Sequence, residues 1–279
     1  MKTIAYQGEP GAYSEAASRN FFGHDITLSP SFTFEIVFNK VKSGAADYGV
    51  VPVENSLYGS VFETYDLLRN YSVKITGELY LQINHYLMAI KKYKPEELKK
   101  IYSHPQALGQ CSKMLKDLKN TKILPVYDTA GAAKLLSEQK EEYVAAIASK
   151  AAAEEYGLKI ISANIQNNAE NYTRFLIISK KRSETELPEK GVKTSLCFEL
   201  QSMPGSLFRA LSVFALRDID LSKIESRPIP HKSFEYIFYI DLMGNLSDTK
   251  VKNAINHLKE ISKNVQIFGS YQTGKTFRS

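Results

Sequence analysis

Cysteine is scarce in this sequence of 279 residues, which contains only Cys111 and Cys197. We expect these two residues in different domains, so a disulfide framework is not expected. Long apolar runs are also missing, since none approaches the ~20 residues that a membrane helix needs. Residues 1–6 lead directly into an expected strand, without the apolar region of a signal peptide. These absences favour a cytoplasmic protein that does not contact a membrane.

Metal-ligand spacing is absent from the sequence as well. No group of His, Cys, Asp and Glu is spaced as a metal site, so we expect no metal and no cofactor. The net charge of +6 would suit nucleic acid or an anionic small molecule. The lysines are dispersed, however, and their densest cluster, residues 91–100, also contains Glu96 and Glu97. We interpret the excess charge as a solvated surface and expect no nucleic-acid partner.

Short apolar strands alternate with helices through the first 180 residues, and small polar residues lie between them. This alternation predicts an α/β fold with parallel sheets. Asp128 and Ser149 are good N-caps, and Pro105 suits the first position of a helix. Ser60 and Glu63 have the spacing of a capping box. The strands that lead into these turns are expected at residues 3–6, 48–53, 101–103, 124–127 and 143–147.

The carboxyl ends of these strands have a functional implication. Open α/β sheets bind ligands there, where helix N-termini present free N–H groups to an anion. The turns rich in Ser, Thr, Asn and Gly would therefore form a site for a small polyanion. The same residues also serve as plain helix caps, which every α/β protein needs, and periodicity alone favours that second interpretation.

The character of the sequence changes after residue 180. Residues 181–191 are mostly charged or polar, contain Pro188 and Gly191, and indicate a linker. Beyond it, the elements are expected in the order βαββαβ, the ferredoxin-like motif. Many unrelated proteins use that motif, so the architecture alone names no function. The expected strands are 194–200, 219–224, 234–242 and 265–271, and the expected helices are 205–216 and 247–261.

Six motifs carry the most specific signal in the sequence. They lie at 8–14 (GEPGAYS), 52–56 (PVENS), 103–108 (SHPQAL), 128–133 (DTAGAA), 145–149 (AAIAS) and 171–175 (NYTRF). The last motif, taken alone, would be an ordinary start of a strand. In this order, however, the six motifs resemble those of the prephenate dehydratase family. Asn167 departs from the pattern, because many members carry an acidic residue four positions before the asparagine of the last motif.

The resemblance implies a catalytic domain over residues 1–180, with two lobes of the type II periplasmic-binding-protein kind and the active site between them. Thr173 would follow directly after the second crossover between the lobes, where its side chain can face the substrate. Lobe one would comprise residues 1–76 and 164–180, lobe two residues 77–163, and the crossovers would lie near 75–78 and 162–166.

The implied reaction is the decarboxylating dehydration of prephenate to phenylpyruvate in L-phenylalanine biosynthesis. Thr173 would be catalytic and donate to the departing 4-hydroxyl group; because a hydroxyl is a poor acid in water, its effect would depend on placement in a desolvated site. Arg174 would bind a carboxylate with its planar fork. The other substrate-binding residues implied by the resemblance are Asn171, Phe175, Asn55, Ser56, Ser103, Gln106, Ala107, Ser14 and Thr64.

Five further polar residues have plainer explanations. His85 lies in an expected strand and favours packing over acid–base chemistry, and His104 favours a position beside a helix N-cap over the role of a base. Cys111 lies in an expected helix without an adjacent base to activate it. Glu54 and Glu63 suit capping or hinge roles at least as well as chemistry.

The C-terminal domain, residues 192–279, resembles an ACT domain, a regulatory module that binds amino acids between paired copies. The motifs that carry this resemblance lie at 204–207 (PGSL), where a helix begins, and at 225–228 (ESRP), in a strand. They imply feedback regulation by L-phenylalanine and a homodimer or homotetramer formed through this domain; a plain dimerisation domain is the alternative. Glu225 would pair with the ammonium group of the effector unless Arg227 holds it in a structural pair. The implied effector-binding residues are Gly205, Ser206, Leu207, Glu225, Ser226 and Arg227.

Two alternatives to this function stay open at the level of sequence. Arogenate carries an amino group where prephenate has a keto oxygen, and nothing in the motifs distinguishes the two substrates. A non-catalytic amino-acid-sensing protein with the same domains is the other alternative, and the pair Thr173 and Arg174 argues against it.

Overall fold

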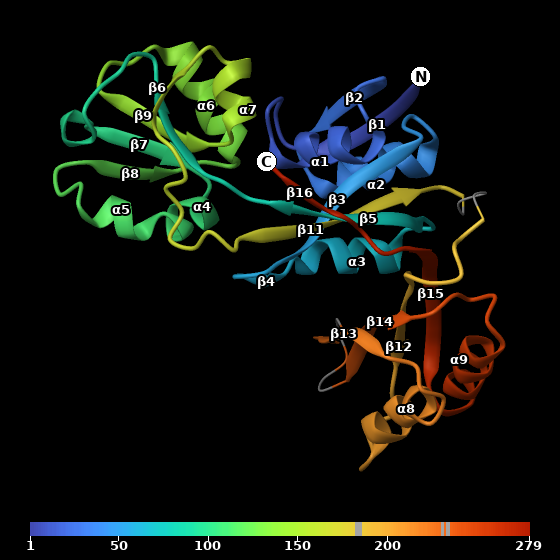
Figure 1. Ribbon diagram of the computed structural model, residues 1–279. Helices are drawn as coiled ribbons and strands as arrows, with labels where there is room; N and C mark the ends of the chain where they lie inside the picture. Colours follow the sequence, from blue (N-terminus) through green and yellow to red (C-terminus); the bar gives the residue numbers. More distant parts are fainter. Residues whose placement is uncertain (182–185, 230–231, 233–234) are drawn as a thin grey trace. The chain divides into compact units, whose positions relative to one another are not determined.

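The computed structural model of the chain describes residues 1–181, 186–229, 232 and 235–279, and within these residues it contains three β-sheets (Figure 1). The chain forms two compact units. The first comprises Met1–Thr64, Leu79–Leu176 and Lys275–Ser279, and the second comprises Tyr65–Glu78 and Ile177–Gly274. All six N-terminal motifs therefore belong to the first unit. We call the part of this unit built on the first sheet the first lobe and the part built on the second sheet the second lobe.

The first sheet has the strand order β16-β5-β11-β3-β1-β2, and β4 pairs with β3. β1 (Lys2–Gln7) pairs in parallel with β2 (Ile26–Ser31) and with β3 (Tyr48–Asn55). The loops after β1 and β3 therefore leave the sheet at the same edge. The other elements are β4 (Gly59–Ser60), β5 (Lys74–Gln82), β11 (Tyr172–Ser179), β16 (Thr276–Arg278), α1 (Tyr13–Phe22), α2 (Phe34–Ser43) and α3 (Phe62–Asn70).

The second sheet has the strand order β10-β6-β9-β7-β8. β7 (Lys100–Ser103) pairs in parallel with β8 (Lys122–Pro125) and β9 (Val144–Ala148). β6 (Tyr86–Ala89) and β10 (Lys159–Ser162) are antiparallel to their neighbours. The sheet is thus mixed rather than parallel throughout, because the chain enters it through β6 and leaves it through β10. Its helices are η1 (Pro95–Glu97), α4 (Pro105–Gln110), α5 (Ser112–Lys116), α6 (Thr129–Gln139) and α7 (Lys150–Glu155).

The chain passes from the first sheet to the second at residues 83–85 and returns between β10 and β11. The sequence placed the first crossover near 75–78. β5 continues through this segment because Ile75, Leu79 and Leu81 are buried at the alternating spacing of a strand.

Most local helix signals in the sequence are confirmed. Asp128 accepts hydrogen bonds from two backbone N–H groups of α6, the shorter at 2.6 Å, and Ser149 accepts one from α7 at 3.0 Å. Pro105 is the first residue of α4. Ser60 differs from the prediction, since it lies in β4 and α3 begins at Phe62.

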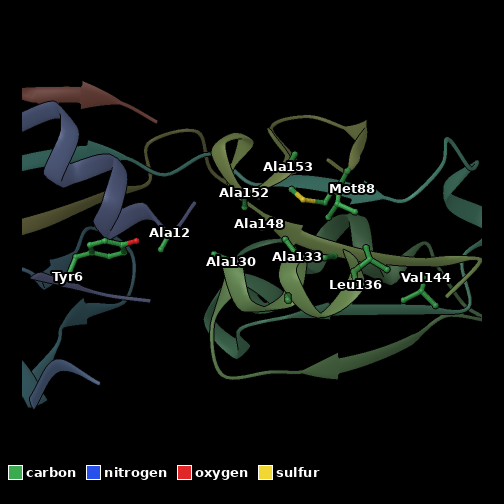
Figure 2. Packing of buried hydrophobic residues seen from close by; sticks show 13 residues of the cluster. Tyr6, Ala12, Met88, Ala130, Ala133, Leu136, Val144, Ala148, Ala152 and Ala153 are labelled. Carbon is green, nitrogen blue, oxygen red and sulfur yellow. The ribbon is translucent and has the colours of Figure 1, made fainter. Parts of the chain in front are cut away.

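A cluster of small buried residues forms the core beneath α6 and α7 (Figure 2). Ala133 of α6, Ala148 of β9 and Ala152 of α7 belong to it, and their short side chains let helices and sheet approach closely. Tyr6 and Ala12, which lie in the first lobe, are part of the same cluster. The two lobes therefore share apolar contacts as well as the two connecting segments.

The third sheet has the strand order β13-β14-β12-β15, and each neighbouring pair is antiparallel. With its two helices it has the βαββαβ order expected from the sequence. Leu196, Phe214 and Leu258 lie in its core. The elements are β12 (Val192–Glu199), α8 (Ser206–Ala215), β13 (Leu221–Pro228), β14 (Tyr236–Met243), α9 (Thr249–Ile261) and β15 (Lys263–Gln272).

The last strand, β16, pairs in parallel with β5 in the first sheet, with Thr276 opposite Tyr80. The sequence had assigned the whole of 192–279 to the second domain. Residues 182–185 of the expected linker, and the start of the strand expected at 234, lie outside the described residues. Among the helices that the structure describes, none is long and apolar enough to span a membrane.

Candidate active site

Asn55 and Thr173 meet where β3 ends and β11 begins. Asn55 Nδ2 donates to Thr173 Oγ1 at 3.0 Å and to Asn171 Oδ1 at 2.8 Å. Its other amide atom, Oδ1, accepts from the backbone N–H groups of Leu57 and Tyr58 at 3.0 and 3.1 Å, which fixes the orientation of the amide. Since Thr173 Oγ1 accepts in this contact, the hydroxyl hydrogen is directed elsewhere and is available to a ligand.

Ser56 and Thr64 hold the loop that carries Asn55. The Ser56 backbone N–H donates to the carbonyl oxygen of Tyr172 at 2.8 Å, and its Oγ accepts from the Tyr172 N–H at 3.0 Å. Thr64 is buried, and its hydroxyl donates to the carbonyl oxygen of Pro52 at 2.8 Å. Ser56 thus lies directly after β3 and Thr64 in the first turn of α3, and the bonds described here go to backbone atoms.

Arg174 and Phe175 follow Thr173 in β11. Because successive side chains of a strand point to opposite faces, Arg174 faces away from Thr173. Its side chain is buried and lies 3.8 Å from the carboxylate of Glu54, which precedes Asn55 in β3. Phe175 is fully buried and packs in the core. The structure therefore brings Thr173 together with Asn55 and Asn171, and it brings Arg174 together with Glu54.

The second lobe reaches this site through Gln110, the last residue of α4. Gln110 is buried, and its Nε2 lies 3.5 Å from Asn171 Oδ1, the oxygen that also accepts from Asn55. Its Oε1 lies 2.6 Å from Nε2 of buried His85. Sequence reasoning missed Gln110 as a site residue. The available signal was a glutamine two residues after the 103–108 motif, on the buried side of a short helix.

The remaining residues predicted in the second lobe lie around the start of α4. The Ser103 hydroxyl is buried and donates to the carbonyl oxygen of Ile147 at 2.6 Å, inside its own lobe. Gln106 is half-buried, and its backbone N–H donates to Nδ1 of His104 at 3.3 Å, so His104 acts as the N-cap. Ala107 is buried in the same helix.

Asn167 stands at the position where many members of the family carry an acidic residue. Its side-chain oxygen accepts from the Lys113 N–H at 2.9 Å, and its Nδ2 donates to the Gly109 carbonyl at 3.3 Å and to Ser112 Oγ at 2.9 Å. A carboxylate cannot donate, so an acidic residue would lose the bond to the Gly109 carbonyl, whereas the Ser112 hydroxyl could reverse its role and donate to it. Asn167 therefore joins the segment before β11 to the end of α4 and the start of α5.

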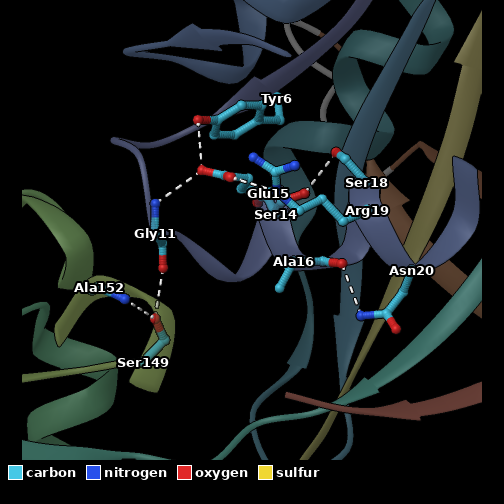
Figure 3. Close-up of polar contacts among 10 residues, drawn as sticks. All are labelled: Tyr6, Gly11, Ser14, Glu15, Ala16, Ser18, Arg19, Asn20, Ser149 and Ala152. Atoms are coloured by element: carbon cyan, nitrogen blue, oxygen red, sulfur yellow. Dashed lines mark hydrogen bonds and ion pairs between the residues drawn. The ribbon is translucent and has the colours of Figure 1, made fainter. Parts of the chain in front are cut away.

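The loop between β1 and α1, residues 8–12, contacts the second lobe (Figure 3). Ser149 Oγ donates to the Gly11 carbonyl at 2.6 Å, and Gly11 N–H donates to the Glu15 carboxylate at 2.9 Å. The Glu9 N–H donates to Asp128 at 3.0 Å. Ser14 is buried in the first turn of α1, which begins directly after this loop.

Burial sets the protonation of three groups near the site. Burial lowers the pKa of His85 to about 4, although its hydrogen bond to Gln110 opposes the shift. Burial raises the pKa of Asp128, against hydrogen bonds from backbone N–H groups that lower it. Burial also raises the pKa of the Cys111 thiol to about 12, so this cysteine is protonated at neutral pH and is not an activated nucleophile.

The predicted effector residues lie in the second unit. Gly205 has φ 79° at the N-cap of α8, and an added Cβ there would meet open space. Ser206 Oγ donates to the carbonyl oxygens of Gln201 and Met203, and Leu207 is partly exposed. In β13, Lys223 lies 3.8 Å from Glu225, while Arg227 contacts Asp66 at 2.8 Å and Ser226 is exposed. Lys223 is thus one partner of Glu225, and Asp66 is one partner of Arg227.

In the part of the chain that the structure describes, no group of three or more His, Cys, Asp or Glu side chains is placed so that it could hold a metal ion.

Known proteins share both the sequence and the fold of this chain. The chloroplastic arogenate dehydratase/prephenate dehydratase 1 of Arabidopsis thaliana is 42% identical over 284 residues, which cover 96% of this chain and 71% of that protein. The prephenate dehydratase of Arthrobacter aurescens, solved in complex with L-Phe, has a TM-score of 0.89 and 32% identity over 97% of this chain and 90% of its own.

A further solved structure, GqqA, described as a novel type of quorum quenching acylase, has a TM-score of 0.88 and 30% identity over 98% of both chains. The family model described as prephenate dehydratase matches residues 4–183, which contain all six N-terminal motifs and the site around Thr173. The chain belongs to the prephenate dehydratase family.

Proposed function

We propose that this protein is a prephenate dehydratase that converts prephenate to phenylpyruvate, carbon dioxide and water. The observation that carries the proposal is the hydrogen bond from Asn55 to Thr173 Oγ1, 3.0 Å long. It occupies a lone pair of the threonine oxygen and leaves the hydroxyl hydrogen to point at a ligand. This is the arrangement that a donor to a departing hydroxyl group requires.

In the proposed reaction, the bond between the ring and its carboxylate breaks and releases carbon dioxide. The electron pair of that bond enters the ring, which becomes aromatic as the C4–O bond breaks. Thr173 stabilises the charge that develops on the departing oxygen, which takes up one proton and leaves as water. Because the driving force comes from aromatisation, one well-placed donor and groups that orient the substrate suffice for catalysis.

The identity of the substrate needs a direct comparison. The Arabidopsis relative carries both activities in its name, and arogenate differs from prephenate only by an amino group in place of the keto oxygen. We propose prephenate as the substrate, with arogenate as the alternative. The test is the ratio of kcat/KM for the two substrates, measured as the formation of phenylpyruvate from prephenate and of phenylalanine from arogenate. If neither substrate yields its product, the proposal is refuted.

An acylase, the activity named for GqqA, is a second candidate for this fold. An acylase that works through a covalent acyl-enzyme requires an activated nucleophilic side chain. In this chain the thiol of Cys111 has its pKa raised to about 12 by burial, and the Ser103 hydroxyl donates to the Ile147 carbonyl. Both observations favour the dehydratase over the acylase.

Regulation forms the second part of the proposal. We assign residues 192–279 to an ACT domain that binds L-phenylalanine through Gly205, Ser206, Leu207, Glu225, Ser226 and Arg227, and that pairs copies of the chain into a homodimer or homotetramer. The βαββαβ order of this unit supports the assignment. The L-Phe complex of the Arthrobacter relative, whose likeness covers 97% of this chain, supports the choice of effector. From the resemblance of the sequence motifs to the prephenate dehydratase family, we also propose that the two lobes of the first unit correspond to those of type II periplasmic binding proteins.

A further inference from the structure

A chain of buried side chains leads from Thr173 to the segment that joins the two lobes. Asn55 Nδ2 donates to Thr173 Oγ1 at 3.0 Å and to Asn171 Oδ1 at 2.8 Å. Gln110 Nε2 donates to the same Asn171 oxygen at 3.5 Å, and Gln110 Oε1 lies 2.6 Å from His85 Nε2. His85, Gln110, Asn171 and Asn55 are each less than a tenth exposed, so water does not compete for these contacts.

The direction of each hydrogen bond between Thr173 and His85 follows from the orientation of the Asn55 amide. Two backbone N–H groups donate to Asn55 Oδ1, so its Nδ2 must face Asn171. Asn171 therefore presents its oxygen, and Gln110 must donate through Nε2 and accept through Oε1. The atom facing Gln110 Oε1 must then be a donor, which requires His85 to carry a hydrogen on Nε2.

His85 is held from its other side by groups at the lobe junction. Its Nδ1 lies 2.9 Å from the hydroxyl of Tyr13, the first residue of α1, and the same hydroxyl lies 2.7 Å from the Asn84 carbonyl oxygen. With a hydrogen on Nε2, His85 Nδ1 is an acceptor, so the hydroxyl hydrogen of Tyr13 is shared between Nδ1 and that carbonyl. Its backbone N–H donates to Gln166 Oε1 at 3.0 Å, and its carbonyl accepts from the Ile165 N–H at 3.0 Å. Both partners lie in the segment that returns from the second lobe to the first. Because burial lowers its pKa to about 4, the imidazole is neutral at pH 7, and the contact with Gln110 Oε1 selects the tautomer with its hydrogen on Nε2.

We propose that His85 is a positioning residue for the dehydratase reaction: its Nε2–H fixes the amide of Gln110, and through Asn171 and Asn55 it fixes the hydroxyl direction of Thr173. The inference rests on the proposed function. Without this donor, the Gln110 amide is free to rotate and to place its oxygen against the Asn171 oxygen. Asn171 would then reorient, and the bond from Asn55 to Thr173 would no longer be determined.

Two substitutions test the donor. His85→Leu removes it, and His85→Gln places an amide N–H close to the original Nε2. With prephenate and arogenate as substrates, we expect kcat of the leucine variant to fall roughly ten-fold, the scale of one buried hydrogen bond. KM should change less than about two-fold, and the glutamine variant should recover most of the loss. Cys111→Ala is the matched control, because Cys111 is buried next to Gln110 in sequence but makes none of the hydrogen bonds that link His85 to Thr173. This variant should lower thermal stability and leave kcat within about two-fold of the wild type.

A double-mutant cycle separates positioning from packing. If His85 acts through Gln110, adding His85→Leu to Gln110→Ala should lower kcat by less than about two-fold beyond the single Gln110→Ala. Losses that multiply would overturn the proposal. The same holds if His85→Gln is no better than His85→Leu, or if Cys111→Ala loses as much kcat as His85→Leu.

A spectroscopic readout distinguishes failure of this inference from failure of the proposed function. Nitrogen-15 NMR of the imidazole should show a neutral ring protonated on Nε2, and its signals should shift in Gln110→Ala. A wild-type protein inactive on both substrates would overturn the proposed function and the catalytic half of the inference with it. A ring protonated on Nδ1, or one insensitive to Gln110→Ala, would overturn the positioning by His85 alone.

Discussion

At the scale of the residue, Thr173 and Arg174 are neighbours in the chain with separate surroundings. Thr173 accepts a hydrogen bond from Asn55, whereas Arg174 lies on the opposite face of β11 beside Glu54. The motif that predicted both residues treated them as a pair. The two-residue period of a strand separates them, so their contributions to binding and to chemistry can be measured independently.

Replacement of Thr173 tests the catalytic assignment. Thr173→Ala should lower kcat by about 10²–10³, the usual loss when one preorganised donor is removed. KM should change little, because the bond to the departing oxygen strengthens only in the transition state. Thr173→Ser is the control, since it retains the hydroxyl that accepts from Asn55. Steady-state kinetics would contradict the assignment if the alanine variant kept more than about half of the wild-type kcat.

Replacement of Arg174 tests the predicted contact with a substrate carboxylate. Arg174→Lys keeps a positive charge near Glu54 but loses the planar fork that binds a carboxylate with two hydrogen bonds. If Arg174 contacts the substrate, KM should rise several-fold while the thermal unfolding temperature changes little. An unchanged KM would leave Arg174 as a partner of Glu54 without a part in substrate binding.

At the scale of the element, the loop between β1 and α1 packs closely against the second lobe. Gly11 has φ +84°, and a Cβ added to it would lie 2.6 Å from Cα of Ala152. The loop also receives a hydrogen bond from Ser149 (Figure 3) and donates one to Asp128. Close approach of the lobes at this point therefore depends on a glycine.

Gly11→Ala tests this close contact. The added methyl group meets backbone atoms that cannot rotate away, so we expect the lobes to separate locally and kcat to fall. Gly44→Ala is the matched control, because Gly44 has a similar φ of +86° but open space around its Cβ. Urea unfolding should show that Gly44→Ala costs about 1 kcal/mol, the strain of a left-handed alanine, and that Gly11→Ala costs at least about 1 kcal/mol more. Equal losses would show that the contact with Ala152 adds nothing.

Sequence patterns predicted the elements whose signals are local. The caps at Asp128 and Ser149 and the βαββαβ order were all recognised from short stretches of residues. The antiparallel β6 and the late return of β16 depend on pairing between distant segments, which local periodicity does not encode. The link from His85 to Gln110 is of the same kind, because 25 residues separate them and only the fold brings them together.

At the scale of the whole molecule, feedback regulation requires that one unit respond to a ligand bound by the other. Phenylalanine should raise the apparent KM for substrate roughly 5–150-fold, the range of a typical coupling between two sites. Such an effect requires that the effector bind the less active state more tightly than the active one.

Gly205→Val tests where phenylalanine acts. The glycine has a left-handed φ and open space at its Cβ position, so a valine would fill space that the effector is expected to use. Initial rates against phenylalanine concentration should show inhibition of the wild type and none of Gly205→Val, with kcat in the absence of effector nearly unchanged. Glu225→Gln is a second variant without backbone strain and should weaken inhibition. A wild type insensitive to millimolar phenylalanine, or two variants as sensitive as the wild type, would refute the assignment.

The return of β16 to the first sheet limits how freely the two units can be separated or exchanged. A chain shortened at the linker near residue 181 would lose not only most of the second unit but also the strand that pairs with β5. The β5 edge would then be open to pairing with other chains, which is a route to aggregation. Gene fusions, tags and grafts of the regulatory unit should therefore preserve residues 275–279, and a minimal catalytic fragment should be built as a circular permutant or with β16 rejoined by a new connection.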